Sequence, residues 1–192
     1  MLTDRQMEIV EKSIEIIDNK GIQGLTIKHL SHEIGITESA LYRHFESKND
    51  IILAILDGFD EISEMLSGMM KTYNGTAIEK IETMFGNMLN LFSETPSVVS
   101  VIFSEELFKN DEVLKKHVKE IQNRNQNTVE MILNKGQENN DVRKDVESKY
   151  LALIIMGSIR LMVKNWSLND YGFNIKDEGN KLVNAIGTLI SV

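Results

Sequence analysis

The chain contains only one proline, Pro96, in 192 residues, and this scarcity restricts the folds that it can adopt. Proline has no backbone N–H and interrupts helices, whereas all-β folds place it freely in their turns. A chain with a single proline is therefore typical of long, unbroken helices. Apolar residues also recur at helical spacing along most of the sequence, without an internal repeat. We predict an all-α fold of about nine helices.

The first fifty residues show the pattern of three short helices. Thr3 and Gln6 form a capping box at the start of the first helix. A second helix follows Thr26 and stops at Gly35, after which Thr37 caps a third helix. Three short helices with a glycine turn between the second and the third are typical of a helix-turn-helix unit.

Caps and turn residues divide the remaining sequence into six further helices. Ser47 with Asp50 forms one cap, and Thr76 with Glu79 forms another. The expected helices cover residues 47–73, 76–93, 97–109, 111–137, 147–168 and 176–191. No linker separates the first of them from the three short helices. The sequence thus predicts a helix-turn-helix domain over residues 1–46 that continues into a larger helical bundle over residues 47–192.

Composition excludes several classes of protein. The chain has no cysteine, which excludes disulfides and thiolate metal sites, and it shows no motif for catalysis, for a cofactor or for a metal. We therefore expect neither an enzyme nor a bound cofactor or metal. It also lacks a signal peptide and any run of eighteen apolar residues, so we expect a cytoplasmic protein without membrane contact. The net charge is −8, and charge alone would not suggest a nucleic-acid partner.

The segment from Leu151 to Val163 is apolar around its whole circumference, except at Ser158 and Arg160. Such a helix must be covered on every side, and thirteen residues are too few to cross a bilayer. It either fills the centre of a large core or lies between the core and a second subunit, and we favour the second arrangement. Together with the apolar stripe of the last helix, it would form a four-helix interface in a homodimer. The predicted interface residues are Ala152, Ile155, Ile159, Met162, Leu182, Ala185, Ile186 and Leu189.

Helical geometry sorts residues 26–48 into an inner and an outer face. The inward-facing residues are Ile27, Leu30, Ile34, Ile36, Leu41 and Phe45. Polar side chains remain at the start and on the outside of the third helix, with Tyr42 among them. An exposed tyrosine contributes little to stability, whereas its phenol can reach a phosphate or a thymine methyl group. This outer face is our candidate surface for double-stranded DNA, and we interpret His29 and His32 as solvated surface residues.

The same stretch resembles the TetR family of bacterial one-component regulators. The family pattern T-x-x-x-[IL]-[AS]-x-x-x-G-[VI]-[ST]-x-x-x-[LI]-Y-x-[HY]-F-x-[SN]-K is matched from Thr26 to Lys48. The resemblance implies a homodimeric DNA-binding transcriptional repressor that leaves its operator when a small-molecule effector binds. It also implies that residues 47–192 bind the effector and form the dimer. The alternative is a DNA-binding architectural or activator protein without an effector.

The resemblance implies a role for each residue of the DNA-facing set. Phosphates are the implied partners of Thr26, Tyr42, His44 and Lys48. Base edges are the implied partners of Lys28, Thr37, Glu38 and Ser39, and Arg43 completes the set. Glu38 has two interpretations, because it either accepts a hydrogen bond from a cytosine amine or only complements the dipole of its helix.

The larger domain gives fewer signals about its ligand. Eight of the ten methionines lie between residues 65 and 162. Soft, adaptable side chains of this type line apolar pockets, although they also fill ordinary cores. With the resemblance, they favour a pocket for an apolar or amphipathic effector. The predicted lining residues are Met65, Met69, Met88, Phe92, Phe103, Met131 and Met156.

Overall fold

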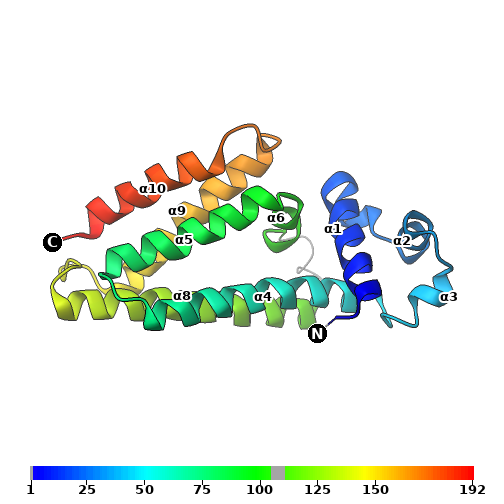
Figure 1. Ribbon diagram of the computed structural model, residues 1–192, viewed down its shortest axis with the longest axis horizontal. Coiled ribbons are helices and arrows are strands. Elements are labelled where there is room, and N and C mark those ends of the chain that lie inside the picture. The colour runs from blue at the N-terminus through cyan, green and yellow to red at the C-terminus, as the bar shows by residue number, and fades with distance from the viewer. Residues whose placement is uncertain (1, 105–110) are drawn as a thin grey trace. The chain divides into compact units, whose positions relative to one another are not determined.

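The computed structural model describes residues 2–104 and 111–192. Within these residues the chain forms nine helices and no strand, which confirms the all-α fold (Figure 1). The helices are α1 (Asp4–Gly24), α2 (Ile27–Ile34), α3 (Glu38–Leu41), α4 (Lys48–Thr72), α5 (Ala77–Glu94), α6 (Ser97–Ile102), α8 (Glu112–Asn139), α9 (Ser148–Leu168) and α10 (Ile175–Ile190). The helix predicted over residues 97–109 is thus found from Ser97 to Ile102, and its residues 105–109 lie outside the described part.

The predicted caps are present at the helix starts. Both halves of the Thr3–Gln6 and Thr76–Glu79 capping boxes form. At the start of α4, the Ser47 N–H donates to Asp50 over 2.8 Å, and the Asp50 N–H donates to the Ser47 hydroxyl over 3.2 Å. These short-range bonds satisfy N–H groups that have no partner inside the helix, so they fix where each helix begins.

The chain packs into two compact units, and α4 and α8 each contribute residues to both. The N-terminal unit lies within Met1–Glu61 and Ser97–Lys119. In it, α1 packs against α2 and α6, and α2 packs against α3. This unit extends past the predicted boundary at residue 46 and includes the first part of α4. As a division between DNA binding and effector binding, that boundary stays a prediction.

The C-terminal unit lies within Ile62–Pro96 and Glu120–Val192. Helix α10 packs along α5 and against α9 (Figure 1). One face of α5 is buried, with side chains that include Ile81, Phe85 and Leu89. Trp166 closes the turn between α9 and α10, because its indole N–H donates to the carbonyl of Phe173 over 2.8 Å.

Helix α9 is long and apolar enough, by length and composition, to cross a membrane. Its side chains nevertheless divide into two different faces. A core face packs inside the C-terminal unit and consists of Leu151, Ala152, Ile155, Ile159, Val163 and Trp166. An outer face is exposed in the single chain and carries Tyr150, Leu153, Ile154, Leu161 and Leu168. The feature of α9 that needs an explanation is therefore the exposure of its apolar outer face.

The division of α9 corrects part of the predicted dimer interface. Ala152, Ile155 and Ile159 are at most 2% exposed, and Ile186 of α10 is 5% exposed. Side chains that are already buried in their own chain have no surface to offer to a second one. A helix that is apolar all round does not reveal which of its faces enters the core, and this caused the error. Of the other predicted residues, Ala185 and Leu189 are exposed, and Met162 and Leu182 are half-buried.

Candidate DNA-binding site

The turn between α2 and α3 is formed by local signals in the sequence. Gly35 ends α2 with a φ of +77°, a left-handed conformation that favours glycine. The Thr26 and Thr37 hydroxyls each accept a backbone hydrogen bond of 3.1 Å, from His29 and from Ala40. These two caps set the directions of two helices that are too short to be stable alone.

Apolar contacts hold the same two helices against the rest of the N-terminal unit. Leu30 of α2 and Leu41 of α3 are fully buried, and Phe45 is 7% exposed. After α3 the chain continues for one more turn, in which the His44 and Phe45 N–H groups donate to the carbonyl of Leu41. The inner face predicted from helical spacing is thus the packed face at these three positions.

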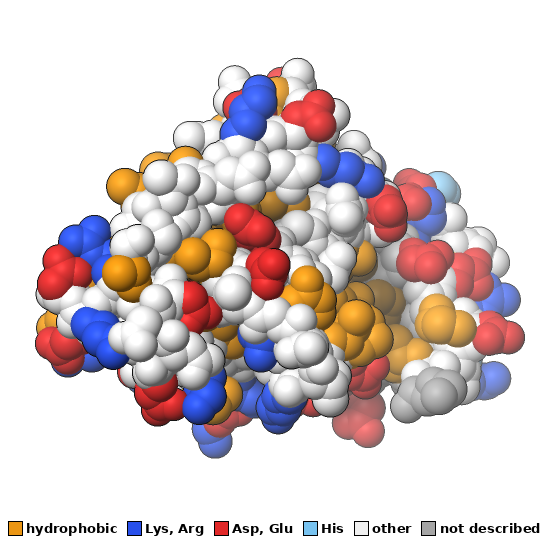
Figure 2. All heavy atoms as spheres, turned by 60° about the vertical axis from the view of Figure 1, so that its left-hand side comes forward, with side chains coloured by type: hydrophobic (Ala, Val, Ile, Leu, Met, Phe, Trp, Pro, Cys, Tyr) orange, Lys and Arg blue, Asp and Glu red, His pale blue; other side chains and the backbone are white. Residues whose placement is uncertain are grey.

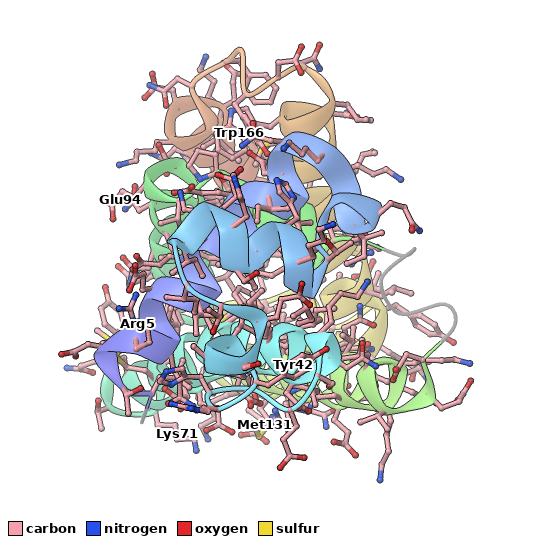
Figure 3. The ribbon with its side chains drawn as sticks, turned by 90° about the vertical axis from the view of Figure 1, so that its right-hand side faces the viewer. Arg5, Tyr42, Lys71, Glu94, Met131 and Trp166 are labelled. Carbon is pink, nitrogen blue, oxygen red and sulfur yellow. The ribbon has the colours of Figure 1, made fainter. Side chains whose placement is uncertain are left out.

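The predicted DNA-facing residues lie at the surface of the N-terminal unit. Half of the surface of Tyr42 is exposed, and this residue, which is labelled in Figure 3, directly follows α3 as its C-cap. The exposed members of the set are Thr26, Lys28, Thr37, Glu38, Ser39, Tyr42 and Arg43, whereas His44 and Lys48 are half-buried. The structure therefore leaves all nine residues accessible, and their individual contacts with DNA stay predictions.

Three cations of this surface have no carboxylate partner among the described residues, a property that they share with Lys80 and Lys164 elsewhere in the chain. Lys28, Arg43 and Lys48 form no ion pair with any carboxylate of the described residues. Other cations are paired over a single turn, such as Arg5 with Glu8 at 2.6 Å and Lys135 with Glu138 at 2.8 Å. Cations without a carboxylate partner can attract phosphates even on a chain whose net charge is −8.

His29 contributes to the site in a way that the sequence did not reveal. Its Nδ1 lies 2.9 Å from the carbonyl oxygen of Gly24, and its Nε2 lies 3.0 Å from Lys20 Nζ. The same Nε2 is 3.2 Å from a carboxylate oxygen of Glu33. His29 thus connects the end of α1 to α2, and it is half-buried at the surface rather than fully solvated. The spacing of four residues to Glu33 was the only available signal.

The predicted pocket residues differ in burial and belong to both units. Met88, Phe92 and Met156 are half-buried or buried in the C-terminal unit, whereas Phe103 belongs to the N-terminal unit. Met65, Met69 and Met131 are at least 50% exposed. Figure 2 shows hydrophobic side chains that reach the surface between charged ones on one face of the molecule. A role in ligand binding for the seven residues stays a prediction.

Two protein families match the chain. Residues 9–55 match the bacterial regulatory proteins of the tetR family, and residues 80–191 match the C-terminal region of the MAATS-type transcriptional repressors. Both families consist of regulators rather than enzymes. The second family consists of repressors, which differ from the alternative of an architectural or activator protein.

Individual relatives match over most of the chain. A fatty acid metabolism regulator protein of Bacillus subtilis (strain 168) is 18% identical over 184 residues, which cover 95% of this chain and 93% of the relative. A nucleoid occlusion factor, SlmA, of Glaesserella parasuis serovar 5 is 26% identical over 116 residues, which cover 60% of this chain and 57% of the relative.

Solved structures show the same fold. The regulator FadR from Bacillus subtilis in complex with stearoyl-CoA has a TM-score of 0.80 and 19% identity, over 94% of this chain and 96% of that one. The ketosteroid regulator KstR2 of Mycobacterium tuberculosis has a TM-score of 0.85 and 16% identity, over 100% and 97%. The chain belongs to the TetR family of bacterial regulatory proteins, and it is a DNA-binding transcriptional repressor.

Proposed function

We propose that the protein represses transcription as a homodimer, and that an amphipathic molecule with a long apolar chain releases it from its operator. The observation that carries the operator-binding part is the accessible face of α2 and α3. It presents Thr37, Ser39 and Tyr42 next to cations that have no carboxylate partner among the described residues. Short polar groups suit base edges, and free cations suit phosphates.

The outer face of α9 supports the homodimer. Leu153, Ile154 and Leu161 are 57–59% exposed in the single chain, and they recur at helical spacing. Leu189 of α10 is 66% exposed as well. An apolar face of this extent needs a cover in water, and a second copy offers the same face for a twofold contact. The interface we propose therefore uses this outer face in place of the core face predicted from the sequence.

The composition of the C-terminal unit and the relatives support an amphipathic ligand. Half-buried methionines such as Met88 and Met156 can adapt their shape to an apolar chain. The relative from Bacillus subtilis regulates fatty acid metabolism, and its structural counterpart holds stearoyl-CoA. We therefore take a fatty acyl thioester as the first ligand to test, and a steroid as the second because of the KstR2 likeness.

Contacts between α4 and α8 give the ligand a means to act on DNA binding. In the C-terminal unit these helices meet through polar pairs, including Ser67 with Thr128 at 3.1 Å and Glu64 with Arg124 at 3.6 Å. Each such hydrogen bond contributes only about 0.5–1.5 kcal/mol net, because water can replace it. A pair of helices held in this way can shift at low cost, and α4 begins at Lys48, next to the DNA-facing residues.

Operator binding in the presence of candidate ligands tests the proposal. An operator duplex would first be selected from a random-sequence pool with the purified protein, and its affinity then measured by fluorescence anisotropy. Stearoyl-CoA should lower that affinity by about 100-fold, which corresponds to roughly 2.7 kcal/mol of coupling, whereas coenzyme A alone should not. A compound that raises the melting temperature but leaves operator affinity unchanged would contradict the coupling. A response to the steroid alone would contradict the acyl-chain assignment.

A further inference from the structure

The carbonyl of His44 is held by a residue from the opposite end of the helix-turn-helix unit. The Gln6 side chain, in the first turn of α1, donates from Nε2 to the His44 carbonyl oxygen over 3.1 Å. The contact is partly buried and joins residues that are 38 positions apart. It therefore connects α1 directly to the turn that carries Tyr42 and His44.

The turn after α3 needs such a contact. Helix α3 spans only Glu38–Leu41, and a helix of this length is not stable by itself. Carbonyl groups at the end of a helix have no partner inside it and must find one elsewhere. Gln6 supplies that partner for His44, whereas the neighbouring Phe45 is held by burial.

Gln6 is itself held in place by the cap of α1. Its Oε1 accepts hydrogen bonds from the Thr3 N–H over 3.0 Å and from the Thr3 hydroxyl over 3.1 Å. Both the oxygen and the nitrogen of the Gln6 amide therefore have partners. Turning the amide by 180° would bring two acceptors together, Oε1 and the His44 carbonyl oxygen. The Gln6 amide has one satisfied orientation, which makes it a rigid support for the turn.

The choice of glutamine over glutamate at this position has a physical reason. Either residue completes a capping box, and a negative charge in the first turn would also suit the helix dipole. Only glutamine can accept from Thr3 and donate to His44 at the same time. We infer that Gln6 is a positioning residue of the DNA interface, which orients the turn bearing Tyr42 and His44 without touching DNA. The inference rests on the placement of these two residues at the operator.

Three variants separate this role from capping and from charge. Gln6→Glu keeps the cap but loses the donor and adds a negative charge. Gln6→Met loses the donor without adding charge. Thr3→Ala removes the Thr3 hydroxyl from the cap but leaves the donor and the Thr3 N–H contact intact. Only the two Gln6 variants share the loss of the hydrogen bond to His44.

The measurement is the ratio of operator affinity to nonspecific DNA affinity, at a temperature where circular dichroism shows each variant to be folded. Gln6→Glu and Gln6→Met should each lower this ratio by about tenfold, the change that corresponds to one hydrogen bond. Thr3→Ala should change it by less than about twofold, and amide exchange at residues 42–45 should accelerate only in the Gln6 variants. An unchanged ratio in Gln6→Met, or an equal loss in Thr3→Ala, would overturn the inference. If neither the wild type nor any variant prefers the operator over nonspecific DNA, the proposed placement of the DNA interface is wrong instead.

Discussion

The Asp111 carboxylate accepts a hydrogen bond from the side chain of Asn49 and thereby joins the start of α8 to the start of α4. The other oxygen of Asp111 accepts from the N–H groups of Val113 and Leu114, over 3.0 and 2.9 Å, and so caps α8. Asn49 directly follows Lys48, which is assigned to a phosphate. This contact therefore gives a movement of α8 one route to the DNA-facing end of α4, in addition to the pair of His117 with Asp57 at 2.9 Å.

We predict that Asn49→Ala weakens the link between ligand and operator. The substitution removes the contact with Asp111 but leaves the cap of α8 intact. A hydrogen bond to a charged group contributes about 1.5–3 kcal/mol, so the 100-fold effect of the ligand should fall by about tenfold or more. The ligand effect of this variant is measured as the ratio of its operator affinities without and with stearoyl-CoA. An unaltered ligand effect would show that α8 does not act through Asn49.

Lys48→Ala should weaken binding to operator and nonspecific DNA alike. A phosphate contact is independent of base sequence, and each one adds about 0.9 to the slope of log affinity against log salt. In a dimer the substitution removes two contacts, so the slope should flatten by roughly 1.8. Titrations at three salt concentrations give the slope. A loss confined to the operator would contradict the phosphate assignment.

Lys28→Ala and Glu38→Ala should have the opposite profile. Both residues are assigned to base edges, where a good contact contributes roughly 1–3 kcal/mol of discrimination. Operator affinity should fall by that amount while nonspecific affinity changes little. Binding to operator and scrambled duplexes tests this. If Glu38 only complements the helix dipole, its substitution will leave the operator preference intact.

Local features of this fold were predictable from the sequence, whereas long-range ones were not. The capping box of Thr3 with Gln6 and the turn at Gly35 depend on residues within one or two turns, and the sequence shows them directly. The contact of Gln6 with His44 joins two elements that only folding brings together. No periodicity reports on such a contact, so the sequence predicted Gln6 as a cap and nothing more.

Helix α9 shows the same limit for packing. Its composition indicated that two surfaces must cover it, and both the core face and the outer face exist. The identity of the core face depends on which side meets α10, and an all-apolar helix contains no polar side to mark it. Ala152 and Ile155 were therefore placed in the interface although they lie in the core.

Charges on the outer face of α9 should separate the dimer. We predict that the double substitution Leu153→Glu and Leu161→Glu weakens self-association by about a thousandfold or more, because each leucine contributes about 1.5–3 kcal/mol when buried. Met131→Glu on α8 is a matched control, since Met131 is 56% exposed and the two leucines are 57% and 59% exposed. Sedimentation equilibrium gives the association constants. Equal behaviour of wild type and the double variant would exclude this face as the interface.

We predict that Gly136 tolerates no side chain. A glycine near the expected end of a helix is ordinarily interpreted as a stop signal, but Gly136 has a different role. The helix continues to Asn139, and a Cβ at Gly136 would lie 2.5 Å from both Ala77 Cβ and Val142 Cγ2. Neither atom can rotate away freely, because Ala77 has no further side-chain atoms and Val142 is branched and fully buried. Gly136→Ala should therefore lower the free energy of unfolding by about 1–3 kcal/mol, despite the higher helix propensity of alanine.

Gly68→Ala is the control for that propensity. Gly68 lies in the exposed part of α4, and a Cβ there would meet no atom within 4 Å. Alanine should raise the free energy of unfolding by about 0.5–1 kcal/mol, since it restricts the unfolded chain and favours the helix. Urea unfolding at a fixed protein concentration compares the two variants, because dimerisation makes stability depend on concentration. If Gly136→Ala were instead more stable than the wild type, α8 and the start of α5 would not pack as closely at Gly136 as the structure shows.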